Sequence, residues 1–196
     1  MSLPPPASSL HELSDQELAL YQRVASLVGT IEDKHEQLVA SSIGDSYLQV
    51  HRAYLQLAAE SPSAATRLEA LKRLVFLNWY LMTEPDIYSG LSYYDPDLMR
   101  ASFTLLEAYL ATTSPLDPEL HWMLSHYAAF WDDDLLSAIT GRPLPVLSAF
   151  IAAKDPRVYL APQGQLPPGA MASRGQMGLY WQSLGVESRH GPAPRQ

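Results

Sequence analysis

The chain has 196 residues, of which 47% are hydrophobic and 17% are charged, so it can bury the core of a folded domain. Its formal net charge of −8 disfavours binding to nucleic acid or to an anionic membrane, because both repel an acidic surface. The absence of cysteine excludes disulfide bonds, thiol nucleophiles and cysteine-ligated zinc.

Residues 1–13 are expected to form a flexible N-terminal segment, because Pro4, Pro5 and Pro6 stand there without helical periodicity. They lack the basic segment and the apolar run of a signal peptide. No part of the chain reaches the roughly 20 consecutive apolar residues that a membrane-spanning helix needs. We therefore expect a cytoplasmic protein with no membrane partner.

Helix signals dominate residues 14–155. Ser14 and Glu17 have the spacing of a capping box, which predicts that the first helix begins there. β-branched residues are sparse, and a short strand is considered only for Arg157–Leu160. We predict an all-α fold, a single-domain helical bundle or short helical array of six to seven helices. Three further helix starts combine a capping residue with proline at the first helical position: Ser61-Pro62, Asp95-Pro96 and Asp117-Pro118.

Glu32 and His35 have the spacing that lets a carboxylate and an imidazole on adjacent helical turns face one metal ion. They stand on a helix rich in acidic residues, so a solvated helix face is the favoured interpretation. A metal site at this pair is kept as the alternative. We expect no cofactor.

The helix expected from Ala64 to Met82 has two different halves. Its first half is amphipathic, whereas Val75–Met82 is apolar on every side except at Asn78. A helix that is apolar all round is surrounded by other elements. We therefore expect this half at the centre of the bundle.

The loop Thr83–Asp95 leaves that central helix and concentrates tyrosines and acidic residues. Tyrosine covers contact area at a modest entropic cost, and loops on a rigid scaffold often carry function. The loop therefore predicts a binding surface, with an alternative in which its tyrosines cover the end of the bundle and hydrogen-bond to free carbonyls. The candidate binding residues are Glu84, Asp86, Tyr88, Tyr93 and Tyr94.

A later helix carries the remaining candidates. Trp122 and His126 are four residues apart and are expected to stack, so we include both as candidate binding residues. His121 lies too far around the helix axis to share a metal ion with His126. The run Asp132–Asp134 predicts a helix break near Trp131, with one aspartate capping a short new helix. The buried stripe of this helix is predicted to contain Leu120, Leu124, Tyr127 and Trp131.

Residues 156–196 are expected to form a Pro/Gly-rich C-terminal tail. Within it, residues 177–184 are too apolar to remain in water, which predicts a docking segment. The sequence leaves open whether this segment packs on its own chain or on a partner.

Two kinds of function remain open. The absence of a catalytic motif, the acidic charge and the tyrosine-rich loop favour a non-enzymatic interaction protein, either an adaptor or an inhibitor that neutralises a basic protein partner. The alternative is a small-molecule or metal-dependent enzyme with its site in the helical bundle. The sequence names no partner and leaves room for a homo-oligomer.

Overall fold

The computed structural model describes residues 9–153 and 164–188. Within these ranges the all-α class is confirmed, since the only strand-like feature is an isolated bridge between Leu166 and Glu187. The predicted count of six to seven helices is wrong, because the described ranges hold ten, several of them short. None of these helices is long and apolar enough to cross a membrane. The hypothetical strand Arg157–Leu160 lies outside the described residues.

The chain divides into two compact units, residues 1–98 and 99–196. The domain of residues 14–155 and the tail of residues 156–196 follow a different division, and they stay predictions. The first unit contains α1 (Leu10–Ala25), α2 (Ile31–Ala40), α3 (Ile43–Glu60), α4 (Ala64–Thr83) and α5 (Asp86–Ser89). The second contains most of α6 (Pro96–Thr112), then α7 (Pro118–Tyr127), α8 (Asp133–Thr140), α9 (Pro145–Ala153) and α10 (Gly175–Ser183).

The capping residue of α1 lies five residues earlier than the sequence predicts. The Ser9 hydroxyl accepts the Glu12 backbone N–H at 3.2 Å, and the Glu12 carboxylate accepts the Ser9 N–H at 2.7 Å, which completes a capping box. The predicted capping box at Ser14 and Glu17 is therefore wrong. Both of these residues lie inside α1 and are buried.

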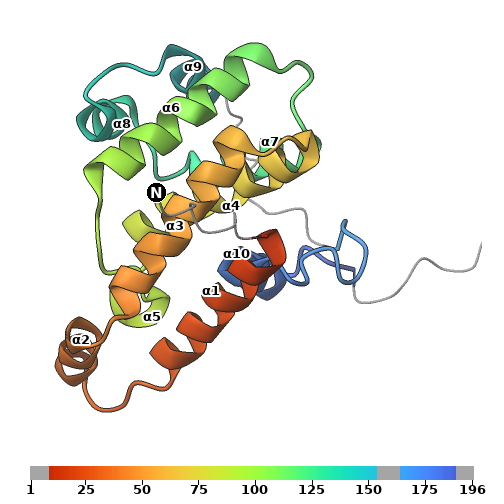
Figure 1. The fold of residues 1–196 in the computed structure, drawn as a ribbon. Coiled ribbons are helices and arrows are strands. Elements are labelled where there is room, and N and C mark those ends of the chain that lie inside the picture. The colour runs from red at the N-terminus through yellow and green to blue at the C-terminus, as the bar shows by residue number, and fades with distance from the viewer. Residues whose placement is uncertain (1–8, 154–163, 189–196) are drawn as a thin grey trace, which may run out of the picture. The chain divides into compact units, whose positions relative to one another are not determined.

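The core of the first unit is the antiparallel pair α3 and α4 (Figure 1). Every residue of α4 from Ala70 to Trp79 is buried, which includes most of the segment predicted to lie at the centre, and residues 80–82 are half-buried. Burial of each large apolar side chain here contributes about 1.5–3 kcal/mol to folding.

A polar network ties α1, α3 and α4 together inside this apolar core. The Tyr54 hydroxyl donates to Glu17 Oε2 at 2.7 Å and accepts from Arg73 Nη1 at 3.3 Å. Arg73 also donates to the Leu10 carbonyl and pairs with Glu69 through its Nε at 2.7 Å. Because buried charges are costly unless they are paired, this network fixes the register of the three helices.

Two helices of the second unit, α7 and α8, begin at the aspartates that the sequence indicates. Asp117 accepts the Leu120 N–H at 2.8 Å at the start of α7, and Asp132 accepts the Leu135 N–H at 2.7 Å at the start of α8. The break near Trp131 is therefore confirmed. The predicted buried stripe of α7 is confirmed as well, since Leu120, Leu124, Tyr127 and Trp131 are all buried.

Helix α10 contains most of the predicted docking segment, and it packs on α7 of the same chain. Met177 and Trp181 are fully buried. Trp181 meets the ring of Trp122 edge-on, with 4.5 Å between ring centroids. Buried Arg174, just before α10, pairs with Glu119 of α7. An apolar face and an ion pair thus hold the segment in place.

Candidate functional site

Helix α2 presents one histidine and two carboxylates on one side. Thr30 and Asp33 form its capping box, with Thr30 Oγ1 accepting the Asp33 N–H at 3.2 Å. Glu32, His35 and Glu36 are spaced by three and four residues, so they share a face of the helix. Hydrogen bonds from its own backbone N–H and from the Thr30 hydroxyl lower the pKa of Glu32.

The short helix α5 faces α2 and supplies the third carboxylate, Asp86. Ile87 and Leu91, which are 7% and 4% exposed, anchor the segment in the core. Gly90 closes the turn with φ +78°, and a Cβ there would lie 2.6 Å from the Tyr47 ring and 2.7 Å from Val24. Only glycine therefore lets the backbone approach α1 and α3 this closely, which fixes the position of α5.

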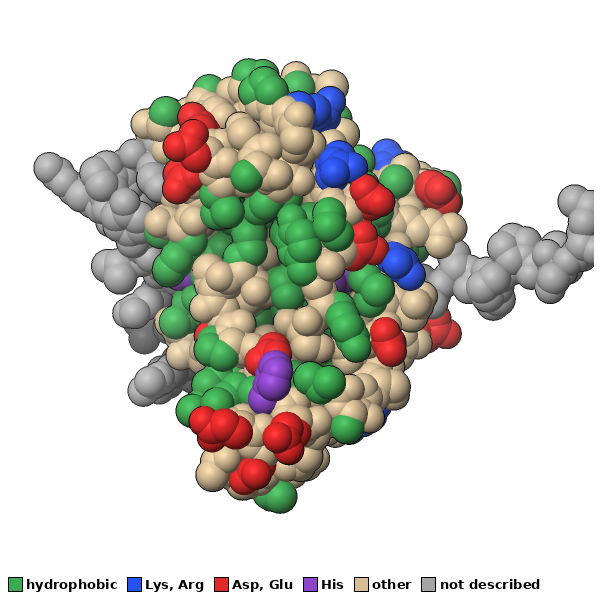
Figure 2. Space-filling model, turned by 90° about the vertical axis from the view of Figure 1, so that its left-hand side faces the viewer, with side chains coloured by type: hydrophobic (Ala, Val, Ile, Leu, Met, Phe, Trp, Pro, Cys, Tyr) green, Lys and Arg blue, Asp and Glu red, His purple; other side chains and the backbone are tan. Residues whose placement is uncertain are grey.

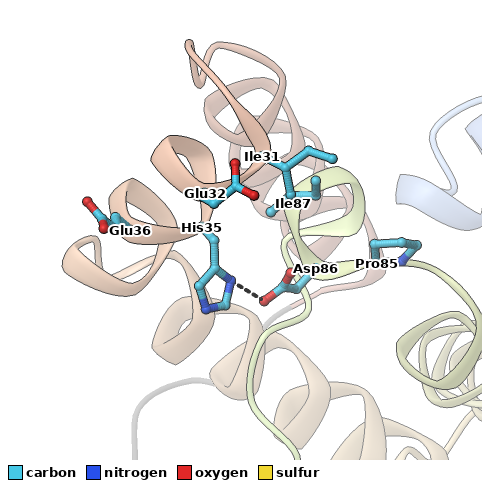
Figure 3. A pocket seen from close by; sticks show the side chains of 7 residues that line it. All are labelled: Ile31, Glu32, His35, Glu36, Pro85, Asp86 and Ile87. Carbon is cyan, nitrogen blue, oxygen red and sulfur yellow. Dashed lines mark ion pairs between the residues drawn. The ribbon is translucent and has the colours of Figure 1, made fainter.

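The two elements meet in an ion pair between His35 and Asp86 (Figure 3). His35 Nδ1 lies 3.3 Å from Asp86 Oδ2, with the imidazole side chain 56% exposed and the carboxylate 27% exposed. These residues are 51 positions apart in the sequence, and each was identified as a candidate for a different reason. The structure brings them together at one site.

The pair borders an open groove of about 440 Å³, which we call the α2–α5 groove. Its apolar floor is formed by Ile31, Pro85 and Ile87, and Ile31 is 61% exposed although it is aliphatic. The remaining lining residues are Glu32, His35, Glu36 and Asp86. At the lower end of the face drawn in Figure 2, acidic side chains likewise gather around a histidine beside hydrophobic side chains. The groove thus combines apolar contact area with three carboxylates.

The chemistry of the groove is limited by its residue types. A carboxylate beside an imidazole orients the ring. The lining residues include no hydroxyl or thiol group. The described residues contain no group of three or more histidine, cysteine or acidic side chains that could hold a metal ion. The arrangement is best suited to attract a cation and to cover an apolar side chain next to it.

Most of the loop residues singled out by the sequence lie outside this groove. Tyr88, Tyr93 and Tyr94 are 51%, 47% and 50% exposed. The ring of Tyr93 covers the first turn of α3 at Gly44, where a Cβ would lie 2.4 Å from its Cδ2 atom. Glu84 ends α4, with its backbone N–H donating to the Tyr80 carbonyl at 2.9 Å.

Trp122 and His126 lie in the second unit and contact α10. His126 Nε2 is 2.7 Å from the Tyr180 hydroxyl, and its ring centroid is 5.0 Å from that of Trp181. Both rings therefore serve in the packing of α7 against α10.

Sequence reasoning missed Glu36 and the apolar floor formed by Ile31 and Ile87. The spacing of Glu32, His35 and Glu36 on one helix was the available signal for Glu36. Nothing in the sequence pairs α2 with α5, because that contact depends on the fold of the whole unit.

No protein-family model, no curated protein and no solved structure matches this chain.

Proposed function

We propose that the α2–α5 groove binds a basic, partly apolar segment of a protein partner, and that the chain acts as a non-enzymatic adaptor or inhibitor. The observation that supports this most directly is the placement of three carboxylates, Glu32, Glu36 and Asp86, around an apolar floor in which Ile31 is 61% exposed. The net charge of −8 adds long-range attraction for a basic partner. This role suits the cytoplasmic location that the sequence predicts, and both remain proposals.

An arginine of the partner would displace His35 from Asp86. A guanidinium forms two parallel hydrogen bonds with a carboxylate, which an imidazole cannot do. The aliphatic part of the arginine and a neighbouring leucine would then lie on Ile31 and Ile87. Two exposed side chains provide further apolar surface: Val28, 70% exposed and three residues before Ile31, and Tyr88, which follows Ile87.

A direct test uses the peptide Ac-Gly-Leu-Arg-Leu-Arg-Gly-NH2 and the full-length protein. The control peptide has citrulline in place of both arginines, which keeps the shape and removes the charge. Asp86→Asn is expected to weaken binding of the arginine peptide by about tenfold, measured by calorimetry or by NMR titration. The triple variant Glu32→Gln, Glu36→Gln, Asp86→Asn should weaken it further.

Asp133→Asn provides the matched control, because it removes one exposed carboxylate at the start of α8 in the second unit. It should change the affinity by less than about twofold, as expected of a surface charge that does not line the groove. Equal binding of the arginine and citrulline peptides would refute the proposal. So would an equal loss of affinity in Asp86→Asn and Asp133→Asn.

The pair at 3.3 Å also supports a second candidate, in which His35 accepts a proton from a small cationic substrate while Asp86 orients the imidazole. His35→Gln separates the two functions. If the groove is a docking site, the variant should bind the arginine peptide at least as well as the original protein, because the competing imidazole is gone. If the groove is a catalytic site, the variant should lose turnover.

A further inference from the structure

A second groove, of about 380 Å³, lies between α1 and α3 in the first unit. We call it the α1–α3 groove. It differs from the α2–α5 groove in charge, since its only ionisable lining residue is an arginine. Its lining residues are Gln16, Ala19, Leu20, Arg23, Ser46, Gln49 and Val50.

The floor of this groove is apolar and close-packed. Leu20 and Val50 are 6% and 2% exposed, so they belong to the core beneath it. Ala19 is small and leaves space between the two longer side chains of α1 that border the groove, Gln16 and Arg23. Helical spacing explains the arrangement, because positions 16, 19, 20 and 23 fall on one face of α1.

The rim is polar and includes two glutamines and an arginine. Among the residues that the structure describes, the side chains of Gln16, Arg23 and Gln49 form no hydrogen bond or ion pair with another residue. The helix positions three and four residues from Arg23 are uncharged on both sides. Within the described part of the chain, Arg23 is therefore an unpaired cation at the edge of an apolar surface, in a protein whose net charge is −8.

We propose that the α1–α3 groove binds the carboxylate of an N-acylated apolar amino acid, either as a free small molecule or as the last residue of a peptide. Arg23 holds the carboxylate through its planar fork of donors. Gln16 and Gln49 each offer a donor and an acceptor to the acyl amide. The apolar side chain of the ligand lies on Leu20 and Val50. The volume of about 380 Å³ is within the range of small-ligand pockets.

This site is independent of the proposed docking function, because it uses other residues and the opposite charge. The probe is N-acetyl-L-leucine, and N-acetyl-L-leucinamide is the control that has the same shape without the carboxylate. NMR titration of the full-length protein is expected to give saturable shifts of amides in α1 and α3 with the acid. The amide should bind about tenfold more weakly, as expected when a charge-assisted hydrogen bond is lost.

Variants identify the residue that selects the acid. Arg23→Gln should remove the preference for the acid, whereas Arg23→Lys should keep part of it, since lysine retains the charge but not the fork. Arg142→Gln, which removes an exposed arginine of the second unit, should leave it unchanged. Equal shifts with acid and amide, or an unchanged preference in Arg23→Gln, would overturn the proposal.

A peptide ending in the same residue, Ac-Gly-Gly-Gly-Leu, separates the two sources of the ligand. Binding at least about tenfold tighter than that of N-acetyl-L-leucine supports a peptide C-terminus, because more of the chain is then in contact. Equal or weaker binding of the peptide supports the free small molecule.

Discussion

His51 is a histidine enclosed in the core of α3. Its side chain is only 3% exposed, and its Nε2 atom has no hydrogen-bond partner among the described residues. Burial lowers its pKa from 6.5 to about 4, although the nearby carboxylate of Asp95 acts in the opposite direction. The ring is therefore neutral in the folded protein at pH 7. Its protonation favours the unfolded state.

This environment predicts that stability depends on pH. Between pH 6.5 and about 4 the unfolded chain binds a proton at His51 that the folded chain does not. The contribution of a neutral His51 is thus complete above pH 6.5. It should decrease as the pH falls toward 4, by about 3 kcal/mol for a pKa shift of this size.

Urea unfolding of the original protein and of His51→Leu from pH 7.5 to 4 measures this contribution. The leucine side chain does not titrate, so the difference in free energy of unfolding between the two proteins isolates the histidine from the carboxylates. The original protein should lose stability relative to the variant as the pH decreases. A difference that stays constant over this range would contradict the expected behaviour.

Residue types alone indicated which side chains could form hydrogen bonds or ion pairs, but not which residues they contact. Glu17 has the spacing of a capping residue, yet it lies inside α1 and accepts a hydrogen bond from Tyr54 of α3. His35 was predicted to lie on a solvated face, and it does so only in part, because Asp86 approaches it from α5. Such pairs join distant parts of the sequence, so no local pattern can predict them.

Some helix ends that are set by local residues were predicted from the sequence, although the cap of α1 at Ser9 was missed. Asp95, Asp117 and Asp132 each accept the backbone N–H three residues further on, and Asp95 also accepts that of Asp97, as the sequence spacing indicates. Helix α9 is different. Its Val146 and Leu147 N–H groups donate to Glu107 of α6, both at 2.8 Å, from about 40 residues away.

Glu107 therefore serves as the cap of α9, and its replacement should destabilise the second unit. Glu107→Ala removes both acceptor oxygens and the negative charge at the positive end of the helix, so we expect a loss of about 2 kcal/mol. Glu107→Gln keeps one acceptor and should cost about half as much. Chemical denaturation measures the free energy, and hydrogen exchange of the Val146 and Leu147 amides locates the change.

The control for this cap is Glu60→Gln, because the Glu60 carboxylate accepts a hydrogen bond from Gln56 on an exposed part of α3. It should change stability by less than about 0.5 kcal/mol, as for an ordinary surface substitution. Unchanged exchange of the two α9 amides in Glu107→Ala would show that the cap is not formed in solution.

At the scale of the whole molecule, composition, charge and the helix signals along the chain were enough to predict an all-helical, acidic protein. They were not enough to predict its grooves. The α2–α5 groove and the α1–α3 groove each exist only between two helices, and opposite charges line them. The sequence shows an excess of acidic residues but not how the fold distributes them.

The net charge leads to a last prediction, which concerns rates and depends on the proposed docking function. A protein of charge −8 attracts a basic peptide before any contact forms, and dissolved salt screens this attraction. The association rate constant of the arginine peptide should therefore fall several-fold between about 0.01 M and about 1 M ionic strength, as the Debye length decreases from about 30 Å to about 3 Å.

Stopped-flow mixing with a labelled peptide separates this long-range effect from contact within the groove. Asp86→Asn should mainly raise the dissociation rate constant, because the contact with the guanidinium is lost, and should change the association rate constant little. The citrulline peptide has no charge to steer, so its association should be independent of salt. Salt could leave the association rate constant of the arginine peptide unchanged while Asp86→Asn still weakens binding. That result would support the contact between Asp86 and the guanidinium and would refute long-range attraction by the net charge.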